Sequence, residues 1–150
     1  KYRTGDWYPI DLFHENNYVQ ALAGMSLYDV LLVNAVIDGM NLVAKEGPTV
    51  NARDGVVILS ETVGACEQLS DDVLTVAPAD IEGTMQALYT ALTMPAEERS
   101  RHAAALKQSI EEEDLTYWIW RILEDIVNLV ERQSGIATPE SAPHHALRSK

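Results

Sequence analysis

The sequence predicts an α/β domain in which helices flank a parallel β-sheet. Three short apolar runs, at residues 28–33, 56–60 and 73–76, alternate with segments whose apolar residues have helical spacing. Continuous apolar runs are typical of strands that are buried on both faces of a parallel sheet. The alternation of strand and helix is typical of α/β domains. The apolar content of 47% is normal for a globular protein.

The first elements come before the first apolar run. Residues 1–14 mix aromatic residues with Pro9, which predicts an extended segment that enters the domain. Asn16 or Asn17 is expected to cap a helix that ends near Leu27. The apolar residues on one face of this helix are Val19, Leu22, Ala23 and Leu27.

The middle of the chain follows the alternation of a parallel sheet. In chain order the predicted elements are the strand at 28–33, a loop with Asp38-Gly39, a helix from Asn41 to about Glu46, the strand after Gly55, a short helix at 62–69 and a strand at 73–76.

The last part of the chain predicts helices and then a tail. Asp80 is expected to cap a helix, Pro95 to precede a second one and Asp114 to begin a long third one. Their apolar residues at helical spacing are Ile81, Met85, Leu88 and Leu92 in the first, and Trp118, Ile122, Ile126 and Leu129 in the third. Residues 134–150 lack periodicity and predict a disordered tail, so the predicted domain is 1–133.

Two features suggest that the chain is part of a longer protein. A doubly wound sheet normally has five or six strands, and the sequence predicts three. The chain also lacks an initiator Met. We therefore expect the opening strands of the domain to lie outside this sequence.

The composition excludes several classes of function. The net charge of −12, with 23 acidic residues against 11 Lys and Arg, argues against a nucleic-acid partner, although a helix N-terminus can still bind one anion. A single cysteine, Cys66, allows no internal disulfide and no cysteine-only zinc site, and it favours a cytoplasmic location. No apolar run is long enough to span a membrane.

The segment that points to chemistry follows the first predicted strand. Its sequence is Asp38-Gly39-Met40-Asn41-Leu42-Val43-Ala44-Lys45-Glu46. Open α/β sheets bind ligands at the carboxyl ends of their strands. Gly39 has no Cβ and allows a close approach of a ligand to the backbone, and the amides of about Met40 to Val43 would form a free helix N-terminus that suits a pyrophosphate.

Two carboxylates lie at the ends of this segment. Asp38 can accept hydrogen bonds from sugar hydroxyls, and Glu46, about two helical turns further on, can bind the hydroxyls of a ribose. From residue types alone, an ordinary Asp-Gly turn with Asp38 as a cap and Glu46 on a solvated helix face has about equal support.

The same segment resembles the donor-site signature of the trehalose-6-phosphate synthase family, which are retaining glycosyltransferases of GT-B architecture with two Rossmann-like domains. The resemblance covers about residues 5–130. The other segments that carry it are Trp7-Tyr8-Pro9-Ile10, Asp29 to Val33, Gly55 to Ser60, Gly64-Ala65, Glu67 to Leu69, Ala91 to Met94 and Glu98-Arg99.

The resemblance implies a role for each position of the segment. Asp38, as the catalytic residue, would bind hydroxyls of the transferred sugar, and Glu46 would bind the ribose of the nucleotide. The residues that would contact the sugar and phosphates through their backbone are Gly39, Met40, Asn41, Leu42 and Val43. The implied reaction transfers glucose from UDP-glucose or GDP-glucose to glucose 6-phosphate with retention, and requires no metal or other cofactor.

The sequence departs from the family in two places. Ala35-Val36-Ile37 replaces a common Pro-Leu-Arg, and the residues after Glu46 differ from the usual continuation. A transferase with another acceptor (a glucosylglycerol-phosphate or pseudo-sugar synthase) and a non-catalytic homologue therefore remain alternatives. The basic donor residues and the sugar-phosphate acceptor site would lie in an N-terminal part outside this chain, and homo-oligomerisation stays open.

A few other residues have ordinary explanations. Cys66 is expected to be a buried structural thiol, and Lys45 to be solvated or salt-bridged. The pair His144-His145 is expected to lie in the tail. Trp118 is expected in the core.

Overall fold

The computed structural model describes residues 3–134. The chain divides into two units, one that ends at Ile110 and one that starts at Glu111. The tail predicted at 134–150, with His144-His145, lies outside the described residues except for Ser134, which is the last residue of a helix.

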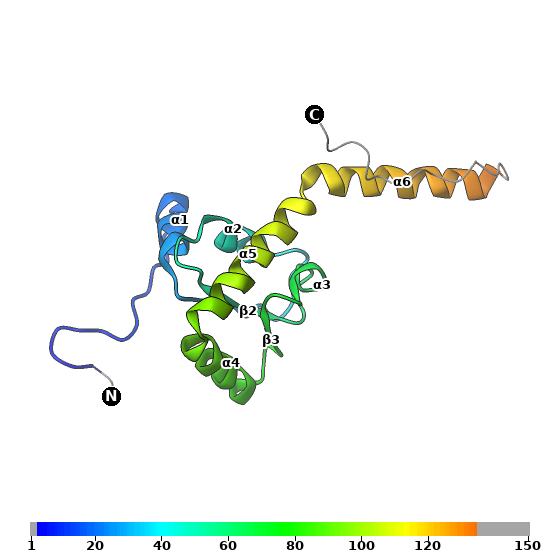
Figure 1. Cartoon of the computed structure of the whole chain (residues 1–150). Helices are drawn as coiled ribbons and strands as arrows, with labels where there is room; N and C mark the ends of the chain where they lie inside the picture. Colours follow the sequence, from blue (N-terminus) through cyan, green and yellow to red (C-terminus); the bar gives the residue numbers. More distant parts are fainter. Residues whose placement is uncertain (1–2, 135–150) are drawn as a thin grey trace. The chain divides into compact units, whose positions relative to one another are not determined.

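A three-stranded parallel sheet in the order β1-β2-β3 forms the centre of the first unit (Figure 1). Its strands are β1 (Val30–Val33), β2 (Val56–Ser60) and β3 (Leu74–Val76). The register pairs Val30 with Val56 and Ile58 with Leu74. All three predicted strands and the parallel α/β class are therefore confirmed.

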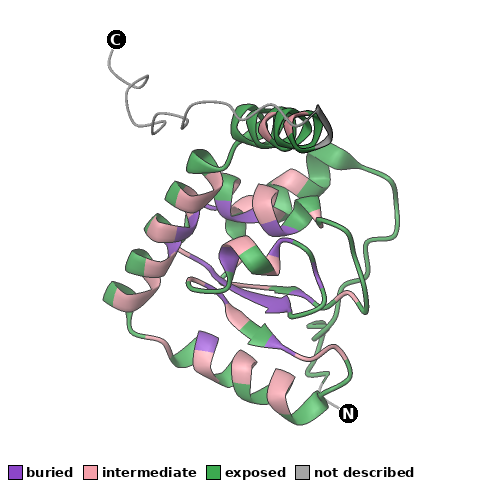
Figure 2. Cartoon of the chain, turned by 90° about the vertical axis from the view of Figure 1, so that its right-hand side faces the viewer, coloured by how far each residue is buried: buried purple, intermediate pink, exposed green. Residues whose placement is uncertain are grey.

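Helices cover both faces of this sheet. They are α1 (Tyr18–Leu27), α2 (Leu42–Val50), α3 (Cys66–Leu69), α4 (Ile81–Thr93) and α5 (Ala96–Glu112). Val57 and Leu59 of β2 lie in one apolar cluster with residues of α2, α3 and α5, whereas Val56 and Ile58 lie in a second cluster with residues of α4. This alternation follows from the period of two along a strand. Figure 2 shows the buried residues concentrated on the strands between these helices.

The prediction that every strand is buried on both faces is correct for β2 and wrong for β1. All five residues of β2 are buried, but Leu32 of β1 is 40% exposed. Within the described residues β1 is at the edge of the sheet, so its side chains have neighbours on one side only.

The apolar residues predicted at helical spacing in two helices are buried only in part. Leu88 of α4 is half-buried and packs with the buried Ala91 in the cluster around β2. Ile81 is 86% exposed, and Met85 and Leu92 are exposed with it. In α1, Val19, Ala23 and Leu27 are exposed, while Leu22 and Met25 are half-buried. Helical spacing identifies candidate faces, but only contact with the sheet or another helix selects the one that is buried.

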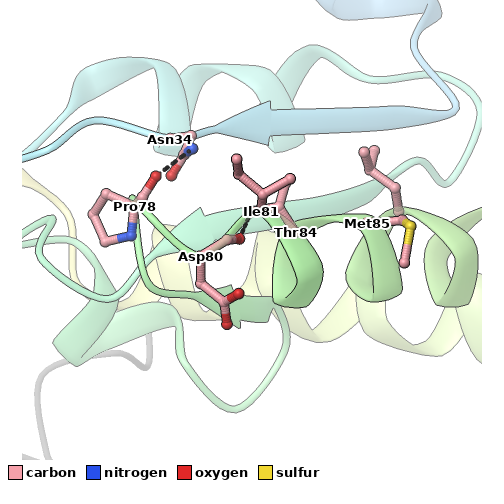
Figure 3. A pocket seen from close by; sticks show the side chains of 7 residues that line it. Asn34, Pro78, Asp80, Ile81, Thr84 and Met85 are labelled. Atoms are coloured by element: carbon pink, nitrogen blue, oxygen red, sulfur yellow. Dashed lines mark hydrogen bonds between the residues drawn. The ribbon is translucent and has the colours of Figure 1, made fainter.

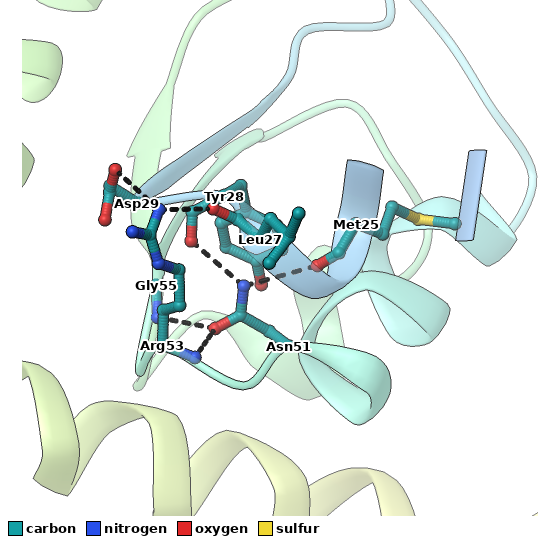
Figure 4. Close-up of polar contacts among 7 residues, drawn as sticks. All are labelled: Met25, Leu27, Tyr28, Asp29, Asn51, Arg53 and Gly55. Carbon is teal, nitrogen blue, oxygen red and sulfur yellow. Dashed lines mark hydrogen bonds and ion pairs between the residues drawn. The ribbon is translucent and has the colours of Figure 1, made fainter. Parts of the chain in front are cut away.

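Asn51, the C-cap of α2, joins three elements of the first unit (Figure 4). Its Nδ2 donates to the carbonyls of Met25 and Tyr28, and its Oδ1 accepts the amides of Arg53 and Gly55. The side chain is nearly fully buried, and these bonds satisfy both of its polar atoms. Asn51 therefore holds the end of α1, the end of α2 and the start of β2 together.

The second unit contains α6 (Leu115–Ser134), and Asp114 caps it by accepting the amide of Tyr117. Trp118 was expected in the core, but it is 51% exposed. Its apolar neighbours at helical spacing are exposed as well, because within residues 111–134 no other strand or long helix is available to cover them. Among residues 3–134, no helix is both long and apolar enough to cross a membrane.

Candidate functional site

Two loops at the carboxyl edge of the sheet are bonded to each other. The loop after β1 contains Asp38, whose carbonyl accepts the amide of Gly64 at 3.1 Å. The carbonyl of Met40 accepts the amide of Ala65 at 3.2 Å, and Asp38 forms a parallel bridge with Val63. The loop after β2 therefore holds the predicted donor segment in place.

The residue types of the donor segment did not predict that the loop after β2 supports it, although Gly64-Ala65 was part of the family resemblance. A Cβ added at Gly64 would overlap the carbonyl of Gly39, so only glycine fits there without a shift of the backbone. Thr62 adds a second tie, because its hydroxyl donates to the carbonyl of Ala35 at 3.2 Å.

Asn41 ends the loop and caps α2. Its φ of 65° is in the left-handed region, and its Oδ1 accepts the amide of Ala44. The helix begins at Leu42, one residue later than predicted. Asn tolerates both the left-handed conformation and the cap position better than most residues.

Asp38 and Asn41 form a closed pair of hydrogen bonds. Oδ1 of Asp38 accepts the backbone amide of Asn41, and Oδ2 accepts its side-chain amide, each at 3.1 Å. A carboxylate can accept about four hydrogen bonds, so both oxygens can still accept from a sugar hydroxyl. The side chain of Asp38 is exposed. The turn and the predicted sugar contact are therefore compatible.

The free amides are fewer than predicted. The amide of Asn41 donates to Asp38, which corrects its inclusion among the free amides. Within residues 3–134 the amides of Met40, Leu42 and Val43 have no hydrogen-bond partner. Three amides at the N-terminus of α2 thus remain available to an anion, where the helix dipole also favours negative charge.

Gly39 borders open space. A Cβ built there would meet no atom of the described residues within 4 Å. Gly39 is thus not required by packing inside this chain. Its lack of a side chain leaves room in front of the turn, as predicted for a ligand that approaches the backbone closely.

Glu46 lies one turn inside α2. The spacing of two helical turns from Asp38 is wrong, because residues 38–41 are not helical. Glu46 is half-buried beside a cavity of about 190 Å³ between α1 and α2, and its Oε1 accepts the hydroxyl of Tyr18 at 3.5 Å. Among the described residues it forms no ion pair.

A second cavity, of about 330 Å³, opens at the carboxyl edge of the sheet (Figure 3). Asn34 after β1 donates to the carbonyl of Pro78 after β3, and the wall beyond them is formed by α4. Asp80 is its acidic residue, but that carboxylate accepts the amide of Gly83 as the cap of α4. Its lining contains no cationic side chain that could bind a phosphate.

Cys66 and Lys45 are two further residues that the sequence singled out within the described part of the chain. Cys66 was expected to be buried, but it is half-buried at the edge of the apolar cluster. Partial burial and the nearby Glu61 raise the pKa of its thiol, which keeps it protonated and weakly nucleophilic. Lys45 is half-buried and lines the cavity beside Glu46; within residues 3–134 it forms no ion pair. No group of three or more metal-ligating side chains occurs in the described part of the chain.

Known proteins share this fold. A Citrobacter koseri trehalose-6-phosphate synthase is 37% identical over 140 residues, which are 89% of this chain and 29% of that protein. A chain named "Trehalose-6-phosphate from E. coli bound with UDP-2-fluoro glucose" superposes with a TM-score of 0.69 at 33% identity, over 76% of this chain and 26% of that one. A Burkholderia xenovorans alpha,alpha-trehalose-phosphate synthase (UDP-forming) in complex with glucose-6-phosphate gives 0.68 and 33%, over 74% and 24%.

The sheet and its helices are therefore those of a Rossmann-like domain of a GT-B glycosyltransferase. The model of glycosyltransferase family 20 matches residues 1–128. The chain belongs to this family, and it spans less than a third of the length of the relatives named above.

Proposed function

We propose that the whole protein transfers glucose from UDP-glucose or GDP-glucose to glucose 6-phosphate and forms trehalose 6-phosphate with retention at the anomeric carbon. The observation that carries this proposal is the group of three open amides at Met40, Leu42 and Val43, between the carboxylates of Asp38 and Glu46. The family membership supports it. So do the relatives named with a UDP-sugar analogue and with glucose-6-phosphate.

In this proposal the site residues act mainly on the donor. The bond between the anomeric carbon and the diphosphate breaks, and the nucleoside diphosphate leaves with more negative charge. The acceptor hydroxyl oxygen bonds to the anomeric carbon, and its proton passes to a phosphate oxygen of the leaving diphosphate. The open amides and the dipole of α2 stabilise that charge. Asp38 accepts hydroxyls of the glucose and serves as the catalytic residue, and Glu46 accepts hydroxyls of the ribose.

The carboxylates cannot neutralise the diphosphate. Lys45 is the basic residue within the 38–46 segment. We propose that further cations and the acceptor site come from the rest of the protein, that no metal takes part, and that the protein works in the cytoplasm. EDTA should then leave the rate unchanged.

An assay of the whole protein tests the proposal. UDP-glucose and GDP-glucose are each combined with glucose 6-phosphate, and the product is analysed by mass spectrometry and by NMR of the anomeric protons. Trehalose 6-phosphate with the donor's configuration is expected. If neither donor binds or is consumed, the proposal fails.

Alternative acceptors are the second question for this assay. The stretch Ala35-Val36-Ile37 lacks the Arg that is common in the family, and Val36 and Ile37 are exposed beside the donor turn. Glycerol 3-phosphate and amino pseudo-sugars therefore belong in the same assay. A faster reaction with one of them would identify a related synthase with a different acceptor.

A further inference from the structure

We propose that Tyr18 is a positioning residue for the nucleotide donor, because its hydroxyl holds the carboxylate of Glu46 in the orientation that a ribose requires. This inference rests on the proposed function, in which Glu46 binds the ribose. Its basis is the hydrogen bond from Tyr18 Oη to Glu46 Oε1, which joins residues 28 positions apart in the sequence.

The two side chains come from two helices that are in contact. Tyr18 lies in the first turn of α1 and Glu46 in α2, and both line the cavity of about 190 Å³ between these helices. The two flanking apolar side chains of that cavity are Leu22 and Val50. The tyrosine ring thus forms part of the wall, while its hydroxyl reaches the carboxylate.

The backbone of Tyr18 is held at the start of a capped helix, while the residue itself is 60% exposed. Asn17 caps α1 by accepting the amide of Gln20, and the carbonyl of Ser26 at the other end accepts the amide of Ala52. A tyrosine has two side-chain torsions, whereas Glu46 has three, so the tyrosine is the more rigid partner. The hydrogen bond therefore restricts the glutamate more than the tyrosine.

The chemistry of the pair suits a ribose. Tyr18 occupies one lone pair of Oε1, so Oε2 and the second lone pair of Oε1 remain for two adjacent hydroxyls. A carboxylate oxygen is a strong hydrogen-bond acceptor for such hydroxyls. Among residues 3–134 no cation pairs with Glu46, and the tyrosine hydroxyl is the polar group bonded to its carboxylate.

The test is a double-mutant cycle on the whole protein with the nucleotide sugar that the wild type uses. The variants are Tyr18→Phe, Glu46→Ala and the two combined, with Tyr89→Phe as a control, because Tyr89 is an exposed tyrosine on α4. Alanine is used at position 46 because glutamine would retain an oxygen that accepts the Tyr18 hydroxyl. Donor binding is measured by calorimetry, and kcat and KM are measured by steady-state kinetics.

Tyr18→Phe should raise the donor Kd and KM about threefold to tenfold, with kcat and the melting temperature nearly unchanged. In the Glu46→Ala background the same change should have little further effect. Tyr89→Phe should bind as the wild type does.

Three results separate the possible failures. If Glu46→Ala binds the donor as tightly as the wild type, the ribose role in the proposed function is wrong. If Glu46→Ala weakens binding but Tyr18→Phe does not, the positioning role alone is wrong. If the two effects add fully, Tyr18 acts independently of Glu46, which also overturns the inference.

Discussion

Gly64, in the loop after β2, lies against the turn after β1 that contains Gly39, and the two glycines have opposite tolerance for a side chain. A Cβ added at Gly64 would overlap the carbonyl oxygen of Gly39, whereas a Cβ added at Gly39 would meet no atom of the described residues within 4 Å. One glycine is therefore required by the protein itself, and the other faces the space assigned to the donor.

This contrast gives the first prediction. Gly64→Ala should destabilise the protein by about 1–3 kcal/mol, because the turn must shift to admit the methyl group, and donor binding should weaken with it. Gly39→Ala should leave the melting temperature unchanged but weaken donor binding about tenfold, since the methyl group would occupy the ligand's space. Calorimetry of unfolding and of donor binding measures both.

Equal melting temperatures for Gly64→Ala and the wild type would contradict the packing argument. Wild-type donor affinity in Gly39→Ala would show that the donor does not approach this turn.

The second prediction concerns the two carboxylates. Asp38→Asn retains an oxygen that can accept the amide of Asn41 but loses the charge, and it should reduce kcat/KM of the whole protein about 100-fold or more. Glu46→Ala should also reduce kcat/KM severely, chiefly through KM for the donor. Steady-state kinetics with varied donor concentration separates the two effects.

Cys66→Ala is the control for this pair, because the thiol touches the apolar cluster around the sheet and not the donor segment. Its turnover should equal that of the wild type. Wild-type turnover in both carboxylate variants would show that Asp38 and Glu46 do not form the donor site.

The third prediction concerns Tyr28, a half-buried tyrosine whose hydroxyl is buried. The ring of Tyr28 fills the space beside Gly55, and within the described residues its hydroxyl has no hydrogen-bond partner. Tyr28→Phe should therefore stabilise the protein by about 1 kcal/mol, since the desolvation of an unpaired hydroxyl is removed. Chemical denaturation at neutral pH measures the change in the free energy of unfolding.

Burial also raises the pKa of Tyr28 above its ordinary value. Above a pH of about 10 the unfolded chain loses this proton while the folded chain retains it, so stability should fall as the pH rises. Tyr28→Phe should lose less stability than the wild type between pH 9 and about 11. Parallel curves for the two proteins would contradict the burial of the hydroxyl.

The fourth prediction concerns Asn51. Its side chain makes four hydrogen bonds and is 5% exposed. Asn51→Ala should cost about 2–4 kcal/mol of stability, because buried backbone groups of α1 and β2 lose their partners. Asn34→Ala removes one exposed hydrogen bond, to the carbonyl of Pro78, and should cost less than about 1 kcal/mol. Thermal unfolding of the two variants compares them, and similar losses would contradict the role of Asn51.

Local signals in the sequence were sufficient for the order of elements. Val56 to Leu59 is an unbroken apolar run, and it lies in the strand that is buried throughout. Asn17, Asp80 and Asp114 each accept an amide at the start of the helix they were expected to begin. Capping and apolar runs depend on neighbours in the chain, so the residues alone predict them.

The donor segment was recognised from its residues, but its geometry was not. Asn41 adopts a positive φ and gives its amide to Asp38, which shortens the helix and reduces the free amides to three. No residue pattern specified this arrangement, because Asn, Asp and Gly all occur in several kinds of turn. The roles of Asp38 and Glu46 stay predictions.

The sequence by itself determined the α/β class, the order of strands and helices, and the place of the donor segment after the first strand. Only the tertiary structure decided which faces are buried, that Gly64 supports the turn of Gly39, and that Tyr18 meets Glu46. The physical reason is the range of the interactions. Caps and apolar runs act between residues a few positions apart, whereas these contacts join residues 25 or more positions apart that only the packing of the sheet and helices brings together.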